Sequence, residues 1–256
     1  MYNLKKSYFT ICCLILLILQ QIYAQPGTND ASFNVADNFS GFDGLIRSTV
    51  IQPDGKIIVG GNLYSFNGTN VGNVVRLNSD GSLDESFSTE TISGFSGEVF
   101  SLALQSDGKI IVGGDFTFFN GKEVNRIIRL NLDGTLDIGF KVGYGFSGGV
   151  VNSIVIQEDG KIVVAGGFTY ADVNPTNNIA RLNSDGSIDE SFKTGFGFSG
   201  VVNTVAIQPN GKIIAGGQFS TYNGIGANKL VRINTDGSID ESFKVNFEYN
   251  NQVLSM

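Results

Sequence analysis

The side chains of this chain that could carry chemistry are carboxylates and amides, because the other usual groups are missing. Among its 256 residues there is no His and no Trp, and the two Cys stand at positions 12 and 13. The chain beyond residue 24 therefore has no thiol or imidazole for nucleophilic catalysis, disulfide formation or zinc binding. Most acidic residues belong to turns, and the candidates outside the turn pattern are Asp115, Glu123 and Asp172. Two carboxylates across one cleft could hydrolyse a glycosidic bond, but the spacing of these three predicts no such pair, so we expect no enzyme.

One pattern recurs four times along the chain. The segment QPDGKIIVGG at residues 52–61 returns, slightly varied, at 105–114, 157–166 and 208–217. A period of about 50 residues predicts supersecondary units that stack on one another. We expect units at about 45–95, 96–147, 148–199 and 200–249, with partial units at 30–44 and 250–256. Each full unit carries two turn glycines 26 residues apart, and the pairs are Gly55 and Gly81, Gly108 and Gly134, Gly160 and Gly186, and Gly211 and Gly237.

Each unit predicts four antiparallel strands and no helix. In the second unit, residues 99–104 alternate large and small side chains, as in a strand whose two faces meet different neighbours. Asp107-Gly108 then signals a two-residue hairpin, and residues 109–112 carry the apolar run of a strand buried on both faces. Residues 127–130 supply a third strand, and 136–140 begin a fourth after a second Asp-Gly turn. Such units predict an all-β fold of β-propeller blades.

Two series of large apolar residues keep the same place in every unit. Glycines end the second strand, where they allow close approach of packed sheets. The large apolar residue two positions after these glycines is predicted to fill the wedge between blades. This series is Leu63, Phe116, Phe168 and Phe219. A packing role is also predicted for Phe33, Phe87, Phe140, Phe192 and Phe243. An aromatic binding platform is the alternative for this second series, but identical phase in every copy favours packing.

The compound motif Gln-x-Asp-Gly-Lys-Ile, Gly-Gly-x-Phe and Arg-Leu-Asn-x-Asp-Gly-x-Leu-Asp-x-x-Phe resembles the delta-60 repeat family over roughly residues 30–256. The resemblance implies a secreted bacterial β-propeller-like repeat protein of uncharacterised function, and it brings no catalytic residues to transfer. The chain departs from the motif at Asn210, which replaces the turn Asp, and at Leu63, which replaces the Phe. Ala171-Asp172-Val173 replaces the aromatic-Asn-Gly of the other units.

The second turn of each unit, as in Asn78-Ser79-Asp80-Gly81, could be a Ca²⁺ loop or a plain turn. Alternating oxygen ligands before a Gly are typical of Ca²⁺ loops. A cation, however, stands where the leading anionic ligand is required, at Arg76, Arg129, Arg181 and Arg232. We therefore favour a turn closed by its own Asn and Asp side chains, with no metal or other cofactor. Each Arg is then expected to pair with the later Asp, as Arg76 with Asp84, in a structural brace.

A ligand site is expected where the copies differ, because the shared residues define the frame. The position directly after the Gly pair, here called the slot, holds Asn62, Asp115, Gly167 and Gln218. The following loop varies most, and it contributes Glu123, Asp172 and Asn174. In a propeller such loops would gather on one face, where ligands commonly bind; neutral drift in solvent-exposed loops is the alternative. We expect a non-enzymatic binding, adhesion or scaffold module for a protein or glycan, with a carboxylate-dependent glycan hydrolase or a structural spacer as alternatives.

The N-terminal 24 residues are predicted to be a secretory signal peptide. Lys5 and Lys6 precede an apolar run at 11–19 that is too short to span a bilayer comfortably; a membrane anchor is the alternative. These residues carry no acid, so their removal leaves 15 basic against 24 acidic side chains. No basic cluster is present, so we expect neither nucleic-acid binding nor insertion into a membrane after cleavage. The expected location is extracellular or at the outer surface.

The two ends do not complete a unit. Residues 30–33 match the last strand of a unit, as at 84–87, and residues 250–256 match only a first strand. We expect a chain that continues beyond Met256; a complete four-bladed molecule or an open arc closed by self-association is the alternative. Unpaired strand edges at both ends would promote that self-association.

Overall fold

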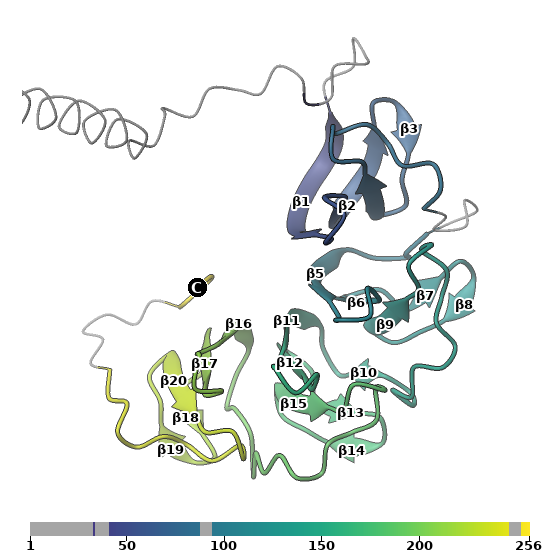
Figure 1. Cartoon of the computed structure of the whole chain (residues 1–256). Helices are drawn as coiled ribbons and strands as arrows, with labels where there is room; N and C mark the ends of the chain where they lie inside the picture. The colour runs from purple at the N-terminus through teal and green to yellow at the C-terminus, as the bar shows by residue number, and fades with distance from the viewer. Residues whose placement is uncertain (1–32, 34–40, 88–93, 246–251) are drawn as a thin grey trace, which may run out of the picture. The chain divides into compact units, whose positions relative to one another are not determined.

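A computed structural model describes residues 33, 41–87, 94–245 and 252–256 (Figure 1). The predicted signal peptide lies outside these residues. Contacts between Cα atoms divide the chain into two parts, Met1–Phe33 and Asn34–Met256, and every described residue except Phe33 belongs to the second part. All regular structure among the described residues is β, and none of them forms a helix of the length and apolarity that a bilayer requires.

Each repeat forms one small antiparallel sheet, called blades 1 to 4 in chain order (Figure 1). Three main strands build each sheet, with the second strand in the middle. They are β1 (Phe42–Ile51), β2 (Ile57–Phe66) and β4 (Val74–Leu77); β5 (Val99–Leu104), β6 (Ile110–Gly114) and β9 (Ile127–Leu130); β11 (Val151–Ile156), β12 (Ile162–Gly166) and β15 (Ile179–Leu182); and β16 (Val202–Ile207), β17 (Ile213–Gly217) and β20 (Leu230–Ile233).

Short ribbons extend each blade beyond the Gly pair, at the end away from the Asp-Gly turns. Their strands are β3 (Thr69–Asn70), β7 (Phe118–Phe119), β8 (Lys122–Glu123), β10 (Phe146–Ser147), β13 (Tyr170–Ala171), β14 (Asn174–Pro175), β18 (Thr221–Tyr222) and β19 (Ile225–Gly226). In the first blade the turn is Asn67-Gly68, and both residues have positive φ, at 47° and 80°. That is the backbone of a two-residue hairpin whose twist matches the strands.

The all-β propeller prediction is confirmed, but the fourth segment of each blade is a turn. Leu136 makes one bridge to Leu130, and the chain then folds back as Phe140 N donates to Asp137 O at 3.2 Å. The Asp137 carboxylate closes this turn by accepting from Gly139 N at 2.9 Å. An Asp that hydrogen-bonds two residues ahead competes with strand pairing, which is why 136–140 does not continue as a strand.

The Asp-Gly hairpin also differs from the two-residue form predicted. In blade 2, Gln105 N donates to Lys109 O and Gly108 N to Gln105 O, both at 2.9 Å. The loop thus has three residues, and only Gly108 takes a positive φ, of 85°. This is a type I turn followed by a left-handed glycine, the usual three-residue hairpin. Asp107 contributes by accepting from Lys109 N at 3.1 Å rather than by adopting a left-handed backbone.

The hydrophobic core lies between consecutive blades. Phe116 of blade 2 is fully buried in one cluster with Ile58 and Val74 of blade 1. Phe168 and Phe219 behave alike: both are 0% exposed, and each clusters with residues of the preceding blade. The predicted wedge packing is therefore confirmed for the three phenylalanines, whereas Leu63 is 2% exposed in a cluster of blade 1 alone.

The second phenylalanine series is only partly buried. Phe87 and Phe192 are buried, Phe140 and Phe243 are half-buried, and Phe33, in the other part of the chain, is 42% exposed. Four of these rings, at 87, 140, 192 and 243, lie under a guanidinium, with Arg Cζ 4.5–4.8 Å from the ring centroid. Stacking on an arginine, rather than wedging alone, accounts for their fixed phase.

Candidate functional site

A buried ion-pair brace repeats in every blade. In blade 3, Asp189 Oδ2 accepts from Arg181 Nε at 2.6 Å and from Lys161 Nζ at 3.0 Å. Its Oδ1 accepts from the Ser191 hydroxyl at 2.6 Å and from Ser191 N at 3.0 Å. The Arg–Asp pair that the sequence predicts is present at 2.6–2.7 Å in all four blades, joining Arg76 to Asp84, Arg129 to Asp137, Arg181 to Asp189 and Arg232 to Asp240.

The brace holds the pKa of its carboxylates low. Burial acts to raise the pKa of Asp137, but the hydrogen bonds from Lys109, Gly139 N and Arg129 outweigh it and lower the pKa to about 2. In Asp84 and Asp189, too, burial opposes and the Lys, Ser and Arg hydrogen bonds win, so the pKa falls below its usual range. These aspartates stay ionised at neutral pH and are saturated with donors. They are structural groups, not acids or bases.

We expect the brace to make stability depend on acid pH. A carboxyl with a lowered folded pKa contributes stability that is complete above its unfolded pKa and is lost as the pH falls through the folded value. For Asp137 that window runs from about pH 4 to about pH 2, and the loss is about 2 kcal/mol. Urea unfolding at pH 5, 3 and 2 measures it. Asp137→Asn should show a correspondingly smaller pH dependence, and an unfolding free energy that stays constant from pH 4 to pH 2 would contradict the brace.

The Asn and Asp side chains of the Asn-x-Asp-Gly turns form hydrogen bonds within the turns. Asp80 Oδ1 accepts from Ser82 N at 2.9 Å and from its hydroxyl at 2.6 Å, and Asn78 Nδ2 donates to Ser82 Oγ at 2.9 Å. Arg76, at the place of a first Ca²⁺ ligand, points its Nε at Asp84. Across the described parts of the chain, no three or more acidic, His or Cys side chains are grouped to hold a metal. The arrangement supports turns that close themselves.

Two of the residues that differ between copies meet, at the end of the strands away from those turns. A pocket of about 700 Å³ lies between blades 1 and 2. Two slot residues that the sequence singles out, Asn62 and Asp115, both line it, and Asn70 joins them from the variable loop. Such a concave site with a few polar groups is the usual form of a small-ligand site.

Close backbone packing positions Asp115 in this pocket. Its Oδ1 accepts from Glu98 N at 2.6 Å, and a Cβ at Gly97 would collide with that oxygen. Glycine at 97 thus lets the carboxylate reach the backbone. The Glu98 side chain also lines the pocket but is ion-paired, with its Oε1 2.6 Å from Arg47 Nε. Asp115 itself remains exposed, so its second oxygen is available to a ligand.

An aromatic residue that the sequence interpretation missed completes the pocket wall. Tyr64 lines the pocket and is 62% exposed. At the same place the other blades carry Thr117, Thr169 and Ser220. The sequence therefore did mark this residue, because a Tyr replaces the small hydroxyl residue of the other units two positions after Asn62. Asn73 was also missed; it fixes the pocket floor by accepting from Leu63 N at 2.8 Å and donating to Gly97 O at 2.9 Å.

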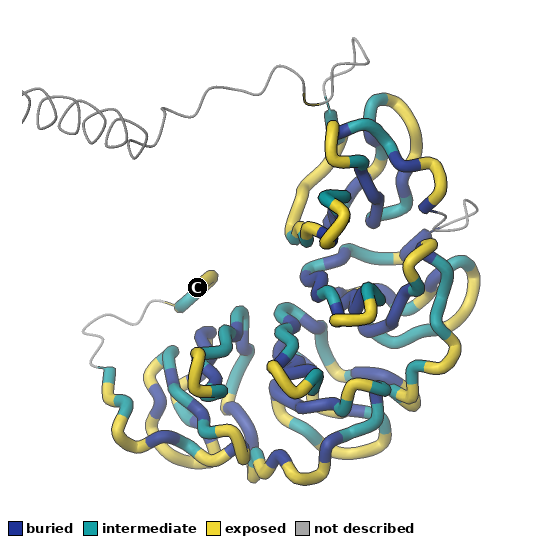
Figure 2. Tube along the Cα trace, viewed as in Figure 1, coloured by how far each residue is buried: buried dark blue, intermediate teal, exposed yellow. Residues whose placement is uncertain are grey.

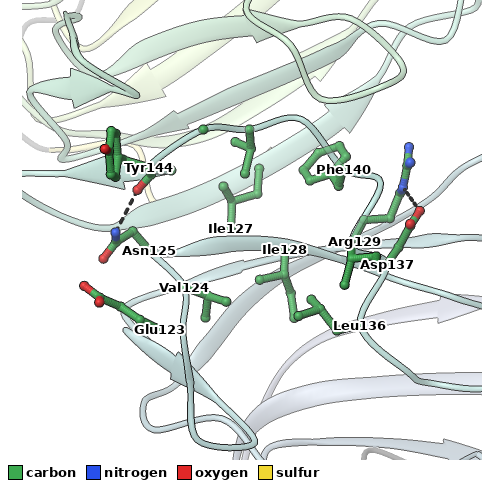
Figure 3. Close-up of a pocket in the computed structure, with 14 residues that line it drawn as sticks. Glu123, Val124, Asn125, Ile127, Ile128, Arg129, Leu136, Asp137, Phe140 and Tyr144 are labelled. Carbon is green, nitrogen blue, oxygen red and sulfur yellow. Dashed lines mark hydrogen bonds and ion pairs between the residues drawn. The ribbon is translucent and has the colours of Figure 1, made fainter.

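The remaining candidate residues lie elsewhere. Glu123 is exposed on β8 and lines a separate pocket of about 320 Å³ beside Val124, Asn125 and Tyr144 (Figure 3). Asn125 Nδ2 closes one side of that pocket by donating to Tyr144 O at 2.7 Å. The position of Glu123 therefore gives no carboxylate pair with Asp115.

Asp172, Asn174 and Gln218 also lie outside the pocket of Asp115. Asp172 has a φ of 53° and accepts from Tyr144 N at 2.9 Å, which makes it a turn residue. Asn174 and Gln218 are both exposed, on β14 and directly after β17. Of the six candidate residues, the structure thus brings together Asn62 and Asp115.

Solved structures with a similar fold include proteins of different kinds. One is the extracellular domain of a B. thetaiotaomicron protein described as a one-component system, at 15% identity and TM-score 0.47, covering 91% of this chain and 26% of that one. Another is virginiamycin B lyase from Staphylococcus aureus, at 17% identity and TM-score 0.43, covering 78% of this chain and 57% of that one. A third is a gluconolactonase from Xanthomonas campestris, at 12% identity and TM-score 0.42, covering 76% of this chain and 60% of that one. The chain thus spans less than two thirds of each, and likeness at this level carries no argument about function.

The family comparison is more specific. No curated protein matches the chain. The sequence profile described as a domain of unknown function, the DUF5122 β-propeller, matches four segments that each run from the Gln before the Asp-Gly hairpin to the Phe of the arginine stack. The segments are 52–87, 105–140, 157–192 and 208–243. Together they cover more than half of the chain, which therefore belongs to the DUF5122 β-propeller family.

Proposed function

We propose that this protein is a secreted, non-enzymatic binding module that holds a glycan in the pocket between blades 1 and 2. Export is supported by the signal-like residues 1–24 and by the resemblance of the repeats to the delta-60 family of secreted proteins. The observation that carries the proposal is the exposed ring of Tyr64 beside Asn62, Asn70 and Asp115.

The chemistry of these groups suits a sugar. A Tyr ring offers an apolar face with a polar edge, on which the C–H face of a pyranose can lie. Amide and carboxylate side chains supply acceptors, and the amides also supply donors, for pairs of neighbouring hydroxyls. Because the chain is acidic overall, a neutral or basic glycan is favoured over a sulfated or phosphorylated one. Binding without turnover is favoured because Glu98, the other acid of the pocket, is ion-paired with Arg47.

The test starts with a glycan array probed with the processed full chain. The best-bound glycan is then titrated calorimetrically against the wild type and Tyr64→Ala. Loss of a central aromatic contact should weaken binding by about tenfold or more. Tyr170→Ala is the matched control, because Tyr170 is 45% exposed but lies in blade 3; it should bind like the wild type. An equal loss of affinity in both variants, or no loss of affinity in Tyr64→Ala, would refute the proposed site.

A carboxylate-dependent hydrolase is the second candidate, because Asp115 and Glu98 share the pocket. It predicts release of reducing ends from the bound glycan, abolished by Asp115→Asn. The binding module predicts intact glycan after prolonged incubation, with Asp115→Asn weakening affinity only. A structural spacer predicts no array binding at all, and that result would exclude both site proposals.

A further inference from the structure

The pocket between blades 1 and 2 holds one carboxylate that no described cation of the chain neutralises. Of the described residues that line this pocket, two are acidic and none is Lys or Arg. Glu98 is ion-paired with Arg47 at 2.6 Å. Asp115 is exposed and forms no ion pair with any described residue. A ligand that brings a positive charge of its own therefore complements this pocket.

The fold does not require the charge of Asp115. Asp115 N donates to Glu98 O at 3.1 Å, and the slot residues of blades 3 and 4 make the same backbone bond. Gly167 N donates to Val150 O at 2.9 Å, and Gln218 N makes its bond at 2.8 Å. A residue without a side chain and one with a neutral amide thus serve equally well at this position. The carboxylate of Asp115 is therefore free for recognition, held in place by the bond from Glu98 N to its Oδ1 at 2.6 Å.

The Tyr64 side chain offers a second contact for a cation. Five described arginines each lie over a phenylalanine ring, with Cζ 4.5–6.0 Å from the ring centroid. None of the described Arg or Lys side chains lies over Tyr64, which is 62% exposed in the same pocket as Asp115. The face of a Tyr ring attracts an ammonium group, and a carboxylate gives that group a charge-assisted hydrogen bond. The two side chains together therefore favour a ligand with an ammonium group.

We propose that the ligand of this pocket is an amino sugar with an unsubstituted amine, and that Asp115 binds its ammonium group. This inference rests on the proposed glycan site and names the class of sugar that the site takes. The amides of Asn62 and Asn70 would bind the hydroxyls of the sugar, and its ring would lie on Tyr64. Both residues of β3, which supplies Asn70, are exposed (Figure 2), so this side of the pocket is open to a ligand from solvent.

Two other cations fit the pocket less well. Ca²⁺ takes about six to eight oxygen ligands, and the described residues place no three acidic side chains together to supply them. A lysine side chain of a protein carries the same ammonium group, but its aliphatic stem has no hydroxyl for the Asn62 and Asn70 amides to bind. An amino sugar offers the charge and the hydroxyls in one residue.

Calorimetric titration of the processed full chain with two matched oligosaccharides tests the proposal. One is a β-1,4-linked glucosamine oligomer, and the other is the N-acetylated oligomer of the same length, both at a pH where the free amine is protonated. The wild type should bind the free amine at least about tenfold more tightly, because acetylation removes the charge that Asp115 binds. Asp115→Asn keeps the Oδ1 acceptor for Glu98 N but loses the charge, so the two affinities should come within about twofold of each other.

Two further variants separate Asp115 from the net charge of the chain. Glu123→Gln removes one negative charge at the separate pocket of blade 2, and it should keep the full preference for the free amine. Arg47→Gln releases Glu98 from its ion pair, so the pocket gains a second free carboxylate. The affinity for the free amine should rise by at least about threefold, and that for the N-acetylated oligomer should stay unchanged. The Arg47 side chain is 48% exposed, so the fold should tolerate its loss.

The outcomes distinguish this inference from the proposed glycan site. Equal affinity for the two oligomers, in a wild type whose binding Tyr64→Ala weakens, overturns the amino-sugar inference and leaves the glycan site standing. The same holds for a preference that Asp115→Asn leaves unchanged or that Glu123→Gln abolishes equally. Tighter binding of trilysine than of the glucosamine oligomer also overturns it. If no glycan binds in a way that depends on Tyr64, both proposals fail.

Discussion

Asp189→Asn is expected to lower the free energy of unfolding by about 3–5 kcal/mol. The substitution keeps the shape of the side chain and the Oδ1 acceptor for Ser191, but removes the charge. It leaves the guanidinium of Arg181, whose side chain is 6% exposed, without its carboxylate at 2.6 Å. An uncompensated buried cation is among the most destabilising single changes. Urea unfolding at pH 7, followed by circular dichroism, measures the loss.

The control lies four residues away in the same turn region. Asp185 is ion-paired with Lys141 at 3.0 Å, but both side chains are exposed, at 44% and 69%. Asp185→Asn should therefore cost less than about 1 kcal/mol. Similar losses in Asp185→Asn and Asp189→Asn would show that the brace is not a buried ion pair of special importance.

Phe168→Ala should cost about 3–5 kcal/mol as well, for a different reason. Its ring is fully buried at the junction of blades 2 and 3, and its centroid lies 4.5 Å from that of Phe146. The same cluster includes Ile111 and Ile127 of blade 2. Truncation leaves a cavity between two blades, so both neighbouring sheets lose packing. Thermal and urea unfolding should shift together.

Phe196→Ala provides the comparison for the same chemical change. Phe196 is 81% exposed, so its removal should change stability by less than about 0.5 kcal/mol. If Phe168→Ala were equally mild, the wedge between blades would not be the core of this fold.

The positions of the strands and turns could be predicted because the same motif occurs four times in the sequence. The spacing of Gly55 and Gly81, and its three copies, predicted turns in the right places, and the fixed phase of Phe116 and Phe168 predicted the core. The failures are local. The run 136–140 has strand-like composition, but Asp137 closes a turn there through Gly139 N. Composition does not show which of two local hydrogen-bonding patterns wins.

The candidate site could be predicted only in part. The rule that copies differ where function lies found Asn62 and Asp115, which share one pocket. It covered one slot and one loop, so it missed Tyr64, which breaks the repeat two residues later. It also selected Asp172, whose difference from the Asn of other units leaves the turn unchanged, with a φ of 53° against 47–49°. The role of Glu98 depends on Arg47, 51 residues away, and no local pattern reveals such a pair.

A crystal structure of the processed chain with the glycan selected on the array would locate the binding site outright. We expect a sugar ring lying on Tyr64 between blades 1 and 2, with its hydroxyls bonded to Asn62, Asn70 or Asp115. A glycan bound instead beside Glu123 and Tyr144, or on another face of the molecule, would show that the pocket between blades 1 and 2 is not the site.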